Sequence, residues 1–326
     1  MTGETSWLSW GLLALLVVWL TSCSTARRVV REPSLGAEMW SSFDGKTMPW
    51  QQWPQELKQP PQAIVLAVHG LSGAKSDFWY LGERLAGSGI ACFSYDLRGQ
   101  GNDPDRAARG DIRSARLWQR DLVAFDRALR QRFPEVPVFW LGESLGSLIV
   151  LHTVVTEEKS GGTLPSGVIL TSPAVGLKME VPATKRLLLR LLSRVVPHHR
   201  LSLEQLSGVN MQDIQVTSTT THGGQMAQTP HHVDAFSLRL LRELDSLMRH
   251  SARAARQLSP STLVLGSPHD VIASEAQIRA FFTEVAAQPK RLRMFPDSHH
   301  LLFHDVDRDT ATDEVKIWTE RVHSAR

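Results

Sequence analysis

Short apolar runs alternate with stretches of helical periodicity along most of the chain. The apolar runs cover residues 63–70, 90–96, 136–142, 167–174 and 261–267, and the more polar segment 290–295 is also expected to form a strand. Continuous runs of this length, bounded by polar or glycine-containing segments, are typical of strands that are buried on both faces. Between the second and third runs, residues 113–133 have helical spacing through Leu117, Leu122, Phe125 and Leu129.

Other segments extend the same alternation. Residues 77–89 and 274–285 predict helices, a helix is expected to start at Ser144, and a final helix is expected over about 307–323. Ahead of the first apolar run, "SSFDGKTMPWQQWP" predicts a hairpin with Asp44-Gly45 at its turn. Strands that alternate with helices imply an α/β protein, with a mostly parallel central sheet and helices on both of its faces.

The alternation is interrupted over residues 176–257, which we interpret as an inserted helical cap on a core of residues 36–175 and 258–326. Within it, "KRLLLRLLSRVV" puts arginines on one helical face and leucines on another. The interruption holds 11 Lys and Arg against 6 Asp and Glu, a net charge of +5. Such a helix suits a lid at an anionic lipid surface, and equally an amphipathic helix that is packed on the core with solvated arginines.

The first residues predict a targeting segment. Residues 7–20 are apolar, too few to span a bilayer comfortably, and suit a signal peptide over 1–22. The sequence "LTSC" that follows resembles the lipobox of bacterial lipoproteins, which predicts lipidation of Cys23, a tether over 23–35 and a place in the bacterial cell envelope. The alternative is an uncleaved inner-membrane anchor, because no Lys or Arg precedes the apolar stretch and Arg27, Arg28 and Arg31 follow it.

Composition narrows the remaining classes of function. The chain has 326 residues, 42% of them hydrophobic and 21% charged, with a formal net charge of +3. A charge this small gives no indication of nucleic-acid binding. The histidine pairs at 198–199 and 231–232 lack a metal-ligand framework, so we expect neither a metal nor a cofactor. The second cysteine, Cys92, lies in a predicted strand and is expected to pack as a small apolar residue, although a disulfide to Cys23 is conceivable.

One motif carries a specific chemistry. Residues Gly142-Glu143-Ser144-Leu145-Gly146 form G-x-S-x-G between a predicted strand and a predicted helix. This is the setting of a nucleophile elbow, where the serine lies on a sharp turn and flanking glycines avoid clashes. Ser144 is therefore our candidate nucleophile.

A serine nucleophile needs a base and a carboxylate that orients the base. In such folds the acid and the histidine follow the serine in chain order, on loops after later strands. Asp270 follows one predicted strand, and His299, His300 and His304 follow the next. Asp297 and Asp305 lie too close to these histidines to be the first choice for the acid. We expect the oxyanion hole to use the backbone N–H groups of Leu145 and Leu71, whereas His69 is expected to be structural.

With these pieces in place, the chain resembles the α/β-hydrolase superfamily, in particular its monoacylglycerol lipase/lysophospholipase branch. The resemblance covers about 38–325 and rests on "VLAVHGL", "YDLRGQGND", "GESLGS", "LVLGSPHDVI" and "HHLLFHD". In that family an acidic residue typically follows the histidine by five positions, which selects His300, since Asp305 stands there. The implied triad is Ser144, Asp270 and His300.

The chain departs from the family pattern at three places. Gln100-Gly101-Asn102-Asp103 stands where His-Gly-x-Ser is frequent, and Gly146-Ser147 stands where Gly-Gly is common. The loop between Gly266 and Asp270 is one residue longer than usual. None of these departures removes a member of the triad, but the last one bears directly on Asp270.

The expected function is hydrolysis of carboxylic esters of lipid-like substrates, monoacylglycerol or lysophospholipid, through an acyl-enzyme. The expected partners are this lipid ester and a membrane surface, reached through the N-terminal lipid anchor and the basic cap helix. An acyltransferase on the same scaffold is the alternative, followed by a ligand-binding homologue without catalysis. The sequence does not decide acyl-chain length, headgroup preference or oligomeric state.

Overall fold

The computed structural model describes residues 31–179, 181–208 and 210–324, and a nine-stranded sheet forms the centre of this part. The strand order is β1-β2-β3-β5-β4-β6-β7-β10-β11. The strands are β1 (Ser34–Leu35), β2 (Met39–Ser41), β3 (Thr47–Trp53), β4 (Ala63–Val68), β5 (Ile90–Tyr95), β6 (Val138–Glu143), β7 (Val168–Thr171), β10 (Thr262–Gly266) and β11 (Lys290–Met294). From β5 to β11 all pairings are parallel, which confirms the predicted sheet.

The predicted hairpin is the antiparallel pair β2–β3, and β3 joins it to the main sheet by an antiparallel pairing with β5. Gly45 lies in its turn with a φ of 82°, a conformation that glycine adopts without strain. Every residue of β4, β5, β6, β7 and β10 is buried. This accounts for their continuous apolar sequences, because helices cover both faces of these strands.

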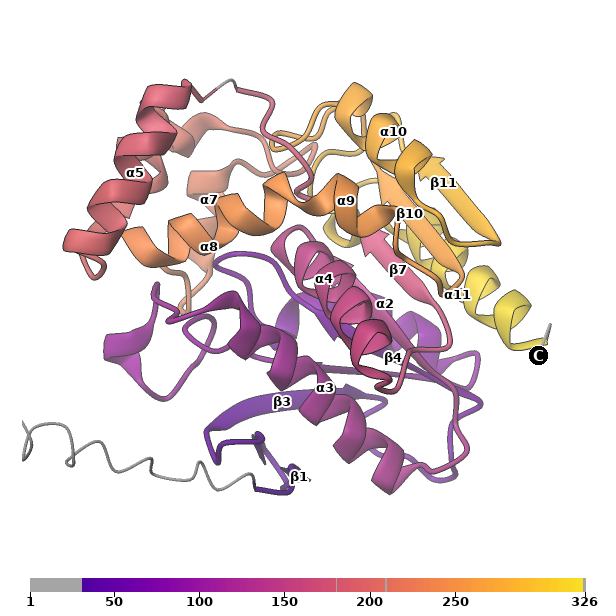
Figure 1. Ribbon diagram of the computed structural model, residues 1–326. Helices are drawn as coiled ribbons and strands as arrows, with labels where there is room; N and C mark the ends of the chain where they lie inside the picture. The colour runs from indigo at the N-terminus through magenta and orange to yellow at the C-terminus, as the bar shows by residue number, and fades with distance from the viewer. Residues whose placement is uncertain (1–30, 180, 209, 325–326) are drawn as a thin grey trace, which may run out of the picture.

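Two layers of helices enclose the sheet (Figure 1). The strongest helical prediction is α3 (Ala115–Arg132), which lies beside α4 (Leu145–Ser160) on one face. A second apolar core, on the other face, joins β4, β5 and β10 to α2 (Trp79–Ala86) and α11 (Arg308–Ser324). The helix α10 (Glu275–Glu284) lies between β10 and β11 in sequence and begins with a Ser274 capping box.

The segment between β7 and β10 holds additional elements. They are α5 (Ala183–Val195), β8 (Arg200–Ser202), α6 (Leu203–Ser207), α7 (His222–Gln228), β9 (Ala235–Ser237), α8 (Leu238–Arg249) and α9 (Ser251–Ala255). In Figure 1, α5 lies farthest from the central sheet; it contacts α8, and α8 in turn contacts α3 and α4. This segment lies over the carboxyl-end side of the sheet. The division into a core and a cap at residues 176 and 257 stays a prediction.

Several N-terminal predictions lie outside the described residues. These are the signal peptide over 1–22, the lipidated Cys23 and most of the tether over 23–35. Cys92 lies within the core as a free thiol, and burial raises its pKa well above the usual range. Across the described ranges, no helix is long and apolar enough to cross a membrane.

Candidate active site

Ser144 lies on a sharp turn between β6 and α4, with a φ of 54° and a ψ of −112°. A non-glycine residue in this region costs of order 1–3 kcal/mol, so the surrounding structure must hold it there. A Cβ on Gly142 would lie 2.3 Å from the carbonyl oxygen of Gly146, and one on Gly146 would lie 1.9 Å from that of Val68. Both positions therefore require glycine for close backbone packing.

The departure at Ser147 has a structural reason. Its hydroxyl donates hydrogen bonds to the carbonyl oxygens of Gly142, at 2.6 Å, and Thr171, at 3.1 Å. The backbone N–H of Ser144 donates to the same Thr171 carbonyl at 3.0 Å. The additional side chain thus ties the first turn of α4 to the ends of β6 and β7.

Asp270 and His300 are brought together at the carboxyl ends of β10 and β11. The Nδ1 atom of His300 lies 2.8 Å from Oδ2 of Asp270, and both side chains are buried. The other oxygen, Oδ1, accepts backbone N–H groups from Ile272 at 2.7 Å and Ala273 at 3.1 Å. These bonds fix the carboxylate so that it holds the imidazole, and the longer loop before Asp270 does not move it out of reach.

The electrostatics of His300 suit a general base. Burial lowers the pKa of His300, but the Asp270 carboxylate more than compensates and raises it above the ordinary value. His300 also lies at the same end of the sheet as Ser144, because the Ser172 hydroxyl, just after β7, donates to the His300 carbonyl at 2.5 Å. Since β6 and β7 are neighbours, the elbow and the Asp270–His300 pair share one site.

The other candidate acids and bases have different partners. His299 lies with its Nδ1 3.3 Å from Asp305, and the Asp305 carboxylate accepts further hydrogen bonds from the backbone N–H and the hydroxyl of Ser218. This links the histidine loop to the inserted segment. Burial lowers the pKa of His304, in contrast to the raised pKa of His300.

The loop after β4 lies against the nucleophile. A Cβ on Gly70 would be 3.2 Å from that of Ser144, so the backbone next to Leu71 closely approaches the serine. Leu145 is the first residue of α4, where a backbone N–H has no intrahelical acceptor. The loop after β4 and the first turn of α4 thus meet at Ser144, and an oxyanion hole formed by the N–H groups of Leu71 and Leu145 stays a prediction.

His69 holds this loop and is not poised for acid–base chemistry. Its Nε2 accepts the N–H of Leu97 at 2.9 Å, so that Nδ1 carries the proton and faces the Gly70 carbonyl at 2.8 Å. Burial lowers the pKa of His69 to about 4, so the ring stays neutral. The structural role expected from the sequence agrees with these contacts.

Two buried residues of the site, Gln100 and Glu143, have roles that the sequence does not predict. Gln100 accepts the backbone N–H of Ser72 at 2.9 Å through Oε1 and thereby anchors the loop that carries Leu71. Glu143, next to the nucleophile, has one carboxylate oxygen without a hydrogen-bond partner among the described residues. Burial, followed by repulsion from Asp77, raises the pKa of Glu143 to about 8. In the sequence, Gln100 stood out only as a departure from the family pattern, and no feature of the neighbouring residues indicated that Glu143 is buried.

Comparison with known proteins agrees with this architecture. The family model described as "Serine aminopeptidase, S33" matches residues 59–307, most of the chain, and the chain belongs to this family. It is 26% identical to phospholipase YtpA of Bacillus subtilis, over 80% of this chain and 96% of the relative. It is 24% identical to the monoglyceride lipase of Mus musculus, over 79% of this chain and 82% of the relative.

Solved structures share the fold. A soluble variant of monoglyceride lipase from Saccharomyces cerevisiae superposes with a TM-score of 0.72 at 19% identity, covering 91% of this chain and 98% of that one. The monoacylglycerol lipase of Paleococcus ferrophilus gives a TM-score of 0.69 at 21% identity, covering 86% and 99%. The predicted α/β-hydrolase fold is confirmed.

Proposed function

We propose that this member of the serine aminopeptidase S33 family hydrolyses carboxylic esters of lipid-like substrates, with monoacylglycerol or lysophospholipid as the substrate class. The observation that carries the proposal is the 2.8 Å contact between Asp270 and His300, beside a serine held at an elbow. The similarity to proteins named monoglyceride lipase and phospholipase supports the choice of a lipid ester.

In the proposed mechanism, Ser144 Oγ attacks the ester carbonyl while Nε2 of His300 takes its proton. Asp270 keeps the imidazole in the tautomer that leaves Nε2 free and stabilises the imidazolium that forms. The N–H groups of Leu71 and Leu145 stabilise the oxyanion. His300 then protonates the leaving alcohol, and water, deprotonated by His300, releases the fatty acid from Ser144.

The proposal is tested with purified Ser144→Ala. We expect its hydrolysis of short-chain p-nitrophenyl esters to fall at least about a thousandfold, as removal of a triad nucleophile does elsewhere. A fluorophosphonate probe should label the wild-type chain and Ser160→Ala, a change of an exposed serine, but not Ser144→Ala. Retained turnover in Ser144→Ala would refute the assignment. Product analysis with added glycerol in the same assay distinguishes hydrolysis from acyl transfer.

The helix α5 supports a role for a lipid surface. Leu187, Leu191 and Val195 are 56%, 50% and 77% exposed, although leucine and valine side chains usually pack inside. Arg186 and Arg194 lie on the same helix. An exposed apolar face with arginines beside it fits an anionic bilayer, from which a lipid ester would enter the site.

Vesicle binding tests this role of α5. We expect Leu187→Ser/Leu191→Ser to reduce binding to phosphatidylglycerol vesicles at least tenfold and to leave turnover of a soluble ester unchanged. Since both leucines are exposed, the fold should tolerate the change. Equal vesicle binding by the variant and the wild type would refute the proposed role of α5 at a lipid surface.

We further propose that Cys23 is lipidated and that the protein is anchored in the bacterial cell envelope. The support is the "LTSC" sequence after a short apolar segment. Metabolic labelling with a palmitate analogue should mark the wild type and not Cys23→Ala. Label that survives Cys23→Ala, or its absence from the wild type, would contradict this proposal.

A further inference from the structure

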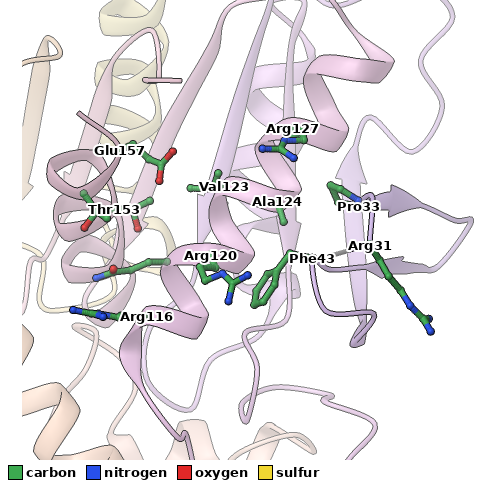
Figure 2. Close-up of a pocket in the computed structure, with 12 residues that line it drawn as sticks. Arg31, Pro33, Phe43, Arg116, Arg120, Val123, Ala124, Arg127, Thr153 and Glu157 are labelled. Carbon is green, nitrogen blue, oxygen red and sulfur yellow. The ribbon is translucent and has the colours of Figure 1, made fainter. Parts of the chain in front are cut away.

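A cavity of about 610 Å³ lies away from the elbow, between α3, α4 and the N-terminal strands (Figure 2). Phe43, from the β2–β3 hairpin, and Ala124 and Thr153, from the two helices, are buried at its base. Its volume is in the range of small-molecule sites. Thr153 lies nine residues after Ser144, about 13 Å along α4, so this cavity is separate from the catalytic site.

The charge of the cavity wall is unusual. Four arginines line it against one carboxylate, Glu157. They are Arg31, Arg116, Arg120 and Arg127. None of the four has an acidic partner within 4.0 Å among the described residues, whereas Arg98, in the loop after β5, and Arg130, on α3, pair with aspartates. Like charges in one cavity repel one another, and a bound anion relieves that repulsion.

One of these arginines is held in place. The guanidinium of Arg120 lies 3.6 Å from the centre of the Phe43 ring, and Figure 2 shows the two side chains together. A stacked guanidinium keeps its N–H groups free for a ligand and loses less entropy on binding. Arg116 lies one helical turn before Arg120 on α3, which places the two on the same face.

We infer that this cavity binds an organic phosphate, with the phosphate on Arg116 and Arg120 and its carbon portion over Phe43 and Val123. Guanidinium groups match phosphate oxygens in a bidentate geometry, which favours this anion over a halide. The guanidinium of Arg31 packs against Gly45 and points away in Figure 2, so the three arginines of α3 against Glu157 leave an excess of two positive charges, which suits a phosphate ester. Such a group could come from a soluble metabolite or from a phospholipid headgroup. Nothing in the catalytic mechanism uses these residues.

The test measures binding of both sources to the full chain in detergent micelles. Calorimetric titration with glycerol 3-phosphate probes a soluble phosphate, and titration of the same micelles with short-chain phosphatidylglycerol or phosphatidylcholine probes a headgroup. We expect the double variant Arg116→Gln/Arg120→Gln to bind one of the two ligands, glycerol 3-phosphate or phosphatidylglycerol, at least tenfold more weakly than the wild type. The control is Arg106→Gln/Arg253→Gln, which removes the same charge from exposed arginines outside the cavity and leaves α5 intact.

A second variant separates the cavity from general surface charge. Thr156 is exposed and lines the cavity, so Thr156→Trp fills space without any change of charge. It should weaken the same arm, while ester hydrolysis by all variants shows that they are folded. Loss in the glycerol 3-phosphate arm identifies a soluble ligand, and loss in the phosphatidylglycerol arm alone identifies a headgroup. If Thr156→Trp binds like the wild type, or if the control pair weakens binding equally, the inference is overturned.

Discussion

Glu143 gives the sharpest prediction about stability, because this carboxylate is buried beside the nucleophile. Burial raises its pKa from 4.5 to about 8, so it is protonated in the folded protein at neutral pH. In the unfolded chain the same group is ionised above pH 4.5. Unfolding therefore releases a proton in this window, and the free energy of unfolding decreases as pH rises.

The magnitude follows from the size of the shift. Each pH unit between the unfolded and the folded pKa costs roughly 1.4 kcal/mol of stability. The contribution of Glu143 is fully present below pH 4.5 and is lost as pH rises to about 8. Glu143→Gln keeps the shape of the side chain and removes the titration. We expect the variant to gain roughly 3 kcal/mol relative to the wild type between pH 5 and pH 7.

Urea unfolding of the full chain in detergent, followed by tryptophan fluorescence at pH 5, 6, 7 and 8, measures this difference. Asp77, whose pKa burial raises to about 7, is present in both proteins, so its own titration largely cancels. Glu158→Gln, a change of an exposed carboxylate on α4, is the matched control and should run parallel to the wild type. A stability difference for Glu143→Gln that stays constant from pH 5 to pH 8 would refute the reasoning.

Three further predictions concern the site. Asp270→Asn should lower kcat by about 10⁴, as the equivalent change does in another triad. It should also move the acidic limb of the pH–rate profile to lower pH, because the carboxylate that raises the pKa of His300 is lost. An acidic limb at the same pH as in the wild type would contradict the pairing of Asp270 with His300. Gln100→Leu leaves the N–H of Ser72 without its acceptor, so kcat/KM for p-nitrophenyl esters should fall at least tenfold, with a smaller effect on KM. Unchanged kinetics would show that other contacts hold the loop that carries Leu71. Gly146→Ala should give no soluble, active protein, because its Cβ would lie 1.9 Å from a β4 carbonyl oxygen, and full activity in a lysate assay would argue against this packing.

The sequence alone predicted the features that depend on neighbouring residues. The buried strands, the long helix α3 and the elbow around Ser144 follow from periodicity and from glycine spacing, which act within a few residues. The N-terminal predictions also rest on the sequence, since Cys23 and the apolar segment before it lie outside the described residues. The choice of His300 needed the resemblance to a known family.

Tertiary structure decided which distant side chains meet. The sequence could not distinguish the partners of His299 and His300 by spacing, because the loops carrying Asp270 and Asp305 both approach this part of the fold. The role of Gln100 and the raised pKa of Glu143 depend on burial by other strands and loops. The arginine-lined cavity likewise combines segments that start at residues 31, 116 and 153. Hydrophobic periodicity indicates which side of a helix or strand is buried, whereas tertiary packing determines which residues that side contacts.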